Sequence, residues 1–179
     1  MTIPEWPEKT VPPINYAMLD LLDCVCDAVA VLGQGPVCTC LVHAGQSVSW
    51  DYCGHCDSGS CGMVYIRPGV SFASTNFPNA DGNSRLGCEG PLAWELEVGI
   101  LRCFPAFADD DGEPSPPDEL TEASLLLVED QVAIRTAIQC CESPYLKTKV
   151  LLDWQPVGPS GNCVGGYWSM VIDPAPWGN

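Results

Sequence analysis

The sequence predicts an α+β fold in which two helices pack on one face of a mainly antiparallel sheet. Two segments, 16–32 and 120–143, repeat their apolar residues with the spacing of an amphipathic helix. The segment 92–104 alternates apolar and polar residues, which is typical of a strand with one buried face. The order of the elements is helix, strands, long loop, strand, helix, strand, strand, and this order indicates the α+β class.

An N-terminal arm precedes the predicted domain. Residues 1–14 contain four prolines and little periodicity, so we expect an extended arm followed by a single domain over residues 15–179. Trp6 is a candidate docking anchor in this arm. The first helix is predicted over Tyr16–Leu32, and Gly33 is expected to stop it.

Extended segments and a long loop occupy the middle of the chain. Segments 37–44, 47–53 and 63–74 are rich in β-branched and aromatic residues and are broken by Gly and Ser, which is typical of short strands. A long loop is expected over 71–91. One face of the strand predicted at 92–104 is expected inside the protein. Its inward residues are Trp94, Leu96, Val98 and Ile100, and its outward residues are Glu95, Glu97 and Gly99.

The last part of the chain is predicted to hold a helix and a hairpin. An acidic, proline-rich loop over 108–119 leads into the helix at 120–143, which Pro144 ends. The apolar stripe of this helix is Ala123, Leu127, Ile134, Ile138 and Cys141. A strand at 146–157, a turn at 158–162 and a final strand at 163–173 should follow. The inward residues of the first of these strands are expected to be Val150, Leu152 and Trp154.

The charge of the chain excludes some partners. It has 23 acidic and 7 basic residues among 179, a formal net charge of −16, and its basic residues are scattered. Such a surface repels DNA, RNA and anionic membranes, so sequence-specific nucleic-acid binding is excluded. No apolar run reaches the roughly 20 residues of a membrane span, and the N-terminus lacks the pattern of a signal peptide. We therefore expect a protein made in a reducing cytosol, where 12 cysteines are many.

The stretch "DYCGHCDSGSC" raises three possibilities. The two-residue spacing of Cys53 and Cys56 suits a zinc chelate. The candidate metal ligands are Cys53, Cys56, Cys61 and Cys88, with His55 as a further possibility. Loop disulfides or plain thiols are the favoured reading, because no second matched cysteine pair lies at the usual distance. A nucleophilic thiol with His43 or His55 as its base is the third possibility.

The remaining motifs favour structure over catalysis. Cys24 and Cys26, like Cys38 and Cys40, are expected to be core or near-core thiols. The run Asp109, Asp110 and Asp111 lacks the ligand spacing of a calcium loop and is expected to be solvated. Phosphate-binding, nucleophile-elbow and zinc-protease motifs are missing. We expect no cofactor and no enzymatic activity.

Three stretches resemble the tail terminator family of long-tailed bacteriophages, and most closely its cysteine-rich members from phages of actinobacteria. "LAWELEVGILRCFP" resembles the central strand of that family, and the acidic "DDDGEP" loop follows it. "LLLVEDQVAIRTAIQCC" resembles the second helix with its paired cysteines, and "DWQPVGPSGNCVGGYWSMVI" resembles the closing hairpin. With the first helix, the resemblance covers most of residues 15–173. The N-terminal arm and the "DYCGHCDSGSC" stretch depart from it, so a connector or stopper protein of the same neck is the alternative.

The resemblance implies a virion protein at the head–tail junction, assembled in the host cytoplasm. It would form a homo-oligomeric ring, expected as a hexamer, between the tail tube protein and the head-to-tail connector or stopper protein. Six copies at −16 each would carry about −96, and an acidic lumen would let DNA pass without specific binding. Candidate acidic residues for the lumen or the interfaces are Glu95, Glu97, Asp109, Asp110 and Asp111. The resemblance also implies one disulfide within the set Cys103, Cys140, Cys141 and Cys163, formed after lysis.

Overall fold

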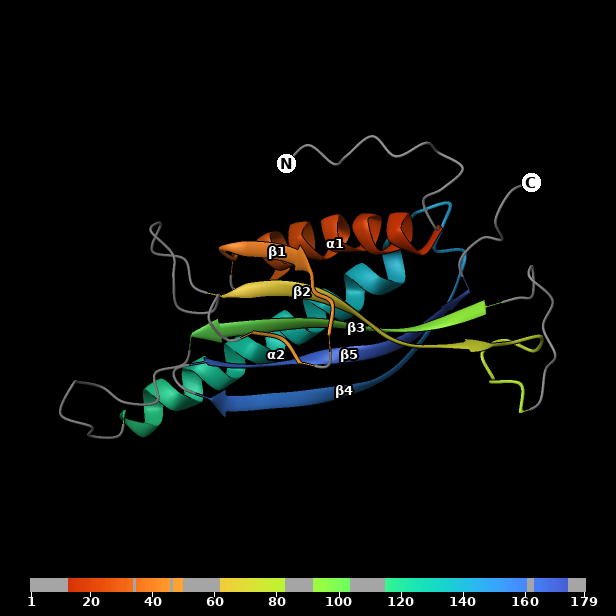
Figure 1. Cartoon of the computed structure of the whole chain (residues 1–179). Coiled ribbons are helices and arrows are strands. Elements are labelled where there is room, and N and C mark those ends of the chain that lie inside the picture. The colour runs from red at the N-terminus through yellow and green to blue at the C-terminus, as the bar shows by residue number, and fades with distance from the viewer. Residues whose placement is uncertain are drawn as a thin grey trace.

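The computed structural model describes residues 13–33, 35–45, 47–49, 62–82, 92–103, 115–160 and 163–173. The chain is an α+β protein, as predicted (Figure 1). The two helices of the described residues are α1 (Pro13–Leu32) and α2 (Pro117–Cys140). The five strands are β1 (Thr39–Val42), β2 (Met63–Ala73), β3 (Leu92–Cys103), β4 (Thr148–Ser160) and β5 (Cys163–Asp173).

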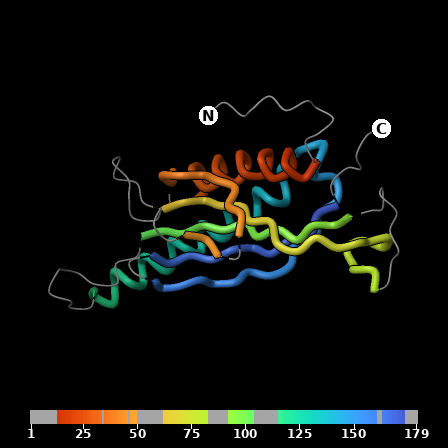
Figure 2. The backbone as a smooth tube through the Cα atoms, viewed as in Figure 1, coloured from red at the N-terminus to blue at the C-terminus, as the bar shows by residue number. Residues whose placement is uncertain are grey.

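The five strands form one mostly antiparallel sheet in the order β1-β2-β3-β5-β4. Only the short edge strand β1 runs parallel to its neighbour, β2. The other three pairings are antiparallel, and the strands run side by side along the length of the molecule (Figure 2). β3 is therefore the central strand.

Both helices pack on one face of this sheet. The central strand contributes Leu96, Val98 and Ile100 to the core, and none of these three side chains is exposed. In the neighbouring strands, Ile66 and Trp168 lie opposite Val98 in register and share its face. The helix residues that cover this face include Leu21, Val25, Ile134 and Ile138. Each such side chain contributes about 1.5–3 kcal/mol when it leaves water, which fixes which face of the sheet turns inward.

The helix boundaries follow from local chemistry. α1 begins at Pro13, within the region predicted as an arm. Proline is favourable at the first position of a helix, because a backbone N–H there would have no hydrogen-bond partner within the helix. The helix ends where the N–H of Gly33 donates to the carbonyl oxygen of Val29 at 3.1 Å. α2 starts at Pro117, three residues before the predicted start, and Asp118 in its first turn faces the positive end of the helix dipole. The arm residues 1–12 lie outside the described residues.

Several details of the predicted strands are wrong. Leu152 was expected inside but is 48% exposed, because the β4–β5 register shifts between Leu151 and Trp154. Such a bulge inverts the alternation, so Leu151 packs against the core instead. Residues 47–49 of the segment predicted as a strand are not in a strand, and residues 50–53 of that segment lie outside the described residues. β4 also continues to Ser160, through part of the predicted turn.

Gly165 of β5 lies opposite Leu101 of β3, and it yields a prediction. A Cβ atom at this position would lie 1.8 Å from the carbonyl oxygen of Ile100. Because that oxygen belongs to the backbone of the central strand, no rotamer change can relieve the clash. We expect Gly165→Ala to lower the free energy of unfolding by about 3 kcal/mol, the upper end of typical overpacking costs. Urea denaturation measures this, with Gly82→Ala as the matched control, since a Cβ there meets nothing within 4 Å. Equal stability of both variants would contradict the described packing of the two strands.

Candidate functional site

The structure describes six of the predicted site residues. Glu95 and Glu97 lie on β3, and Cys103, Cys140, Cys141 and Cys163 lie at or beside the ends of β3, α2 and β5. The candidate metal ligands Cys53, Cys56, Cys61 and Cys88 lie outside the described residues, as does the run Asp109, Asp110 and Asp111. Within the ranges that the structure describes, no three His, Cys, Asp or Glu side chains are placed to share a metal ion.

Disulfides tie α1 to the rest of the molecule. Cys24 bonds to Cys141, and Cys26 bonds to Cys40 of β1. Cys38 is disulfide-bonded as well. The prediction that these α1 and β1 cysteines are core thiols is therefore wrong. Residues two apart on a helix point in widely different directions, so each of the two α1 cysteines reaches a different element.

The four cysteines of the predicted disulfide set behave differently from one another. Cys141 is buried and bonds to Cys24, which was not in that set. Cys140, the preceding residue, has an exposed free thiol. Cys103 and Cys163 lie opposite each other in the β3–β5 register, and both are disulfide-bonded. Sequence reasoning missed Cys24 as a partner because it lies 117 residues away from Cys141 and no local pattern joins the two.

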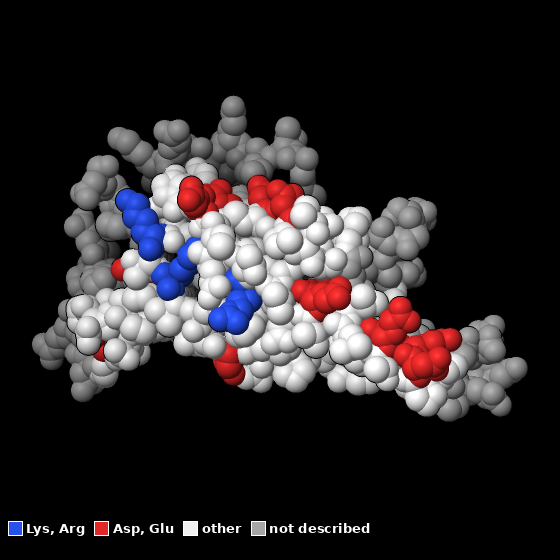
Figure 3. Space-filling view, turned by 180° about the vertical axis from the view of Figure 1, so that it is seen from behind, with Lys and Arg blue, Asp and Glu red and all other residues white. Residues whose placement is uncertain are grey.

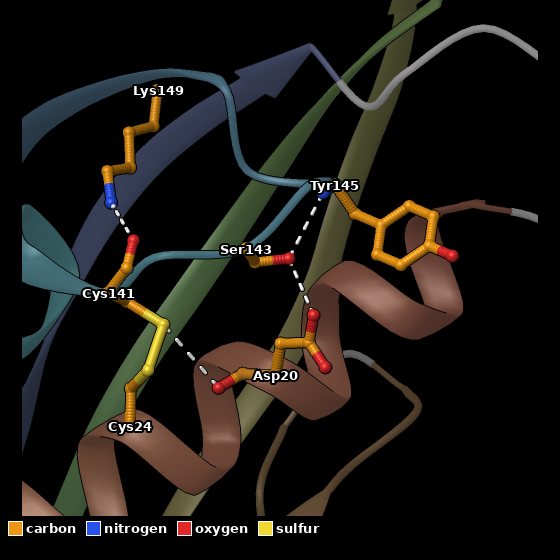
Figure 4. The surroundings of a disulfide bond; sticks show 6 residues. All are labelled: Asp20, Cys24, Cys141, Ser143, Tyr145 and Lys149. Carbon is orange, nitrogen blue, oxygen red and sulfur yellow. Dashed lines mark hydrogen bonds between the residues drawn. A yellow bond between two sulfur atoms is a disulfide. The ribbon is translucent and has the colours of Figure 1, made fainter.

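Polar contacts reinforce the Cys24–Cys141 bond (Figure 4). The hydroxyl of Ser143 donates to a carboxylate oxygen of Asp20 at 2.5 Å and accepts from the backbone N–H of Tyr145 at 3.1 Å. The ammonium of Lys149 donates to the carbonyl oxygen of Cys141 at 2.9 Å, and burial lowers the pKa of Lys149. The segment after α2 is thus fastened to α1 by one covalent bond and by hydrogen bonds.

A buried ion pair between β3 and α2 was missed by sequence reasoning. The guanidinium of Arg102 donates to both carboxylate oxygens of Asp130, at 2.9 and 3.1 Å, and it also donates to the carbonyl oxygen of Gly35 at 2.8 Å. The side chain of Asp130 is fully buried and that of Arg102 is 7% exposed. The available signal was the position of Asp130 on the buried side of α2, four residues before Ile134. A charge in that position requires a partner.

A second ion pair lies on the face of the sheet away from the helices. Arg67 and Glu97 are register partners on β2 and β3, and the Nε of Arg67 donates to Glu97 at 2.7 Å. A second guanidinium nitrogen of Arg67 donates to the other carboxylate oxygen of Glu97. This hydrogen bonding raises the pKa of Arg67. Glu95 lies on the same face, two residues along the strand. One of the two acidic candidates on β3 therefore has its charge matched by a cation.

Tyr65 lies beside this pair and yields a pH prediction. Its ring covers Gly99, where a Cβ would meet a ring carbon at 2.4 Å. Burial, and then the nearby charge of Glu97, raises the pKa of Tyr65 well above its usual value. The folded state thus favours the neutral phenol. Its contribution to stability is complete below the unfolded-state pKa of about 10 and is lost as the pH rises above it. We expect the midpoint of urea denaturation to fall between about pH 10 and 11, and Tyr65→Phe to reduce that fall. Parallel curves for the two proteins would contradict this expectation.

The first two thirds of α2 carry exposed apolar residues. In this helix the buried residues are Asp130, Ala133, Ile134, Ala137 and Ile138, so none of them precedes position 130. The helix begins beyond the end of the sheet (Figure 1). Ala123 and Leu127, predicted as part of the apolar stripe, are consequently only partly buried. The side chains of Leu125, Val128 and Val132 are 63%, 52% and 56% exposed.

Comparisons with known proteins assign no family. No model of a protein family matches the sequence, and the search of curated proteins gives no match. Among the described helices, none combines the length and the apolar character that crossing a membrane requires.

Proposed function

We propose that this protein is a structural subunit of a phage virion. Copies of it form a ring at the head-proximal end of the tail tube of a long-tailed bacteriophage. The ring terminates the tail and joins it to the neck, while genome DNA passes through the lumen. The subunit works by protein contacts, without a cofactor and without catalytic turnover.

The observation that carries this proposal is the continuous unit β3-α2-β4-β5. The three stretches that resemble the tail terminator family, 92–105, 125–141 and 153–172, lie largely on these four elements. The central strand, the second helix and the closing hairpin of the resemblance thus correspond to strands of one sheet and to a helix that packs on it. The exposed apolar residues at the start of α2 further support an assembling subunit, because exposed apolar patches mark protein contacts.

The acidity of the chain supports the passage of DNA. A lumen lined by carboxylates repels phosphates, so a nucleic acid slides through without sticking. Glu95 is the better lumen candidate of the two on β3, since the charge of Glu97 is matched by Arg67. In this proposal, the face of the sheet away from the helices turns toward the lumen.

Charge reversal in the virion tests the lumen assignment. We expect phage carrying Glu95→Lys to assemble particles of normal appearance but to give a lower infective titre, because a ring of lysines would bind the passing DNA. Asp23→Lys, an equal charge change at an exposed position of α1, is the matched control and should keep the titre of the unmodified phage. Equal titres for the two variants would show that Glu95 does not line the lumen.

Native mass spectrometry of the purified protein, with and without reductant, tests the proposed function itself. A metal-free hexamer is expected. Gold-labelled antibody on intact virions then locates the ring, and a label at the top of the tail tube separates a terminator from a connector or stopper closer to the head. A monomer that retains one tightly bound zinc ion would overturn the proposal in favour of a zinc-binding interaction module.

A further inference from the structure

We infer that the outward side of α2, from its projecting end to Val132, docks onto the opposite end of a second copy of the same chain, so that subunits join head to tail. The inference rests on the proposed ring and names its interface. The docking surface consists of an outer stripe, Leu125, Val128 and Val132, and an acidic row beside it, Asp118, Glu122 and Glu129. The receiving surface is the cationic end, defined as Lys147 and Lys149, together with the exposed Leu152 on β4.

The outer stripe is a second apolar face of α2. Its three residues are spaced by three and four positions, so they lie in one row along the helix. At about 100° per residue, this row lies roughly 180° from the buried side chains that face the core. The core therefore cannot cover it. More than half of each of these side chains is exposed, and a row of this kind is the pattern by which one helix packs against another surface.

The charges beside the stripe indicate what covers it. Asp118, Glu122 and Glu129 repeat at helical spacing along one side of the stripe, and all three are exposed. The space-filling view shows acidic side chains over this projecting end of the molecule, while Lys and Arg side chains gather toward the other end (Figure 3). The projecting end of the molecule is thus acidic, and the Lys and Arg side chains seen in this view lie away from it.

The cationic end has charges available for a partner. Arg67 and Arg102 are held in ion pairs within the subunit. Lys147 is exposed, and Lys149 is partly buried, where its ammonium donates to the carbonyl oxygen of Cys141. Leu152, 48% exposed on the edge strand β4, adds apolar surface close in sequence to these lysines. Because the whole chain carries −16, these cations are the natural target for the acidic row of another copy.

The arrangement of the two surfaces also sets the geometry of assembly. Two copies that paired their projecting ends would bring acidic ends together, which costs energy when the charges are desolvated. A contact between different surfaces of two identical subunits repeats from copy to copy and closes into a ring when the rotation permits. The head-to-tail contact therefore supplies the interface that the proposed ring needs.

Two variants that damage opposite surfaces test this inference. The docking variant is Leu125→Lys with Val128→Lys, and the receiving variant is Lys147→Glu with Leu152→Glu. We expect the unmodified protein to form rings in native mass spectrometry and each variant alone to be monomeric. An equal mixture should give a heterodimer that grows no further, because the mixture retains one intact pairing of surfaces. Asp23→Lys is the matched control and should form rings, and circular dichroism should show the fold intact in every variant.

Other outcomes overturn the inference in distinguishable ways. If either variant alone formed rings, the surface altered in that variant would not be part of the interface, while the proposed ring function would stand. A receiving variant that still dimerises alone would indicate a contact of stripe against stripe. Monomeric variants that fail to pair in the mixture would show that these two surfaces do not bind each other. An unmodified protein that stays monomeric at high concentration would overturn the head-to-tail contact, and labelling of virions would then decide the function independently.

Discussion

Replacing both Cys24 and Cys141 by serine is expected to lower the free energy of unfolding by about 5 kcal/mol. The bond joins residues 117 apart in sequence, so its loss frees a long loop in the unfolded chain. In the chain-entropy description of disulfides, the stabilisation grows with the logarithm of the loop length. For a domain of this size, such a loss corresponds to a fall in Tm of roughly 10–20 °C. Denaturation in urea and thermal scans under non-reducing conditions measure both quantities.

The second disulfide of α1 provides the comparison. Cys26 and Cys40 are 14 residues apart, so their replacement by serine should cost only about 3 kcal/mol by the same reasoning. The hydrogen bonds of Ser143 and Lys149 remain in both variants, so the difference isolates the covalent links. If the two double variants lost equal stability, loop length would not govern the contribution of these bonds. If neither lost any, the bonds would be absent from the protein in solution.

The buried pair of Arg102 and Asp130 carries the other large effect. Asp130→Ala leaves the guanidinium of Arg102 in a site where it is 7% exposed. Removing one partner of a buried ion pair costs about 3–5 kcal/mol, because the remaining charge keeps its desolvation penalty. We expect the Tm to fall by roughly 6–20 °C for a domain of this size. Arg102→Leu should have a similar effect, because it removes the cation that Asp130 faces.

The double variant separates the charge from the packing. Arg102→Leu combined with Asp130→Leu removes both charges, and replacing a buried pair with apolar residues is often neutral. We therefore expect the double variant to be more stable than either single variant, measured by the same urea titration. Additive losses would instead show that each residue acts through other contacts and not mainly through the pair.

The ion pair of Arg102 and Asp130 lies at the base of the projecting part of α2, so it bears on the proposed assembly as well as on stability. Asp130 is the first buried residue of α2, so Arg102 holds the helix at the point where it meets the sheet. The half of the helix before this point has no buried residue, although it continues the same α-helix. An anchored base and an exposed end together make a rigid projection, and docking a rigid element costs less conformational entropy than docking a loop.

The fold class was predictable because it depends on local patterns. The alternation of β3 appears in the sequence because a strand with one covered face needs an apolar side chain at every second position. The apolar spacing of α1 has a similar cause with the helical period. The acidity of the chain is likewise a property of composition, so the prediction against sequence-specific nucleic-acid binding depends on composition alone.

What only the tertiary structure decided are the contacts between residues far apart in the chain. Cys24 and Cys141 pair because α1 packs against the end of α2, and no spacing in the sequence encodes that distance. Arg102 and Asp130 meet for a similar reason, across the interface of β3 and α2. The exposure of Leu152 came from a register shift, a property of two strands together and not of either alone. Local sequence periodicity determines which side of each element is apolar. The packing of the elements determines which side chains meet, and which apolar side chains of α2 stay exposed.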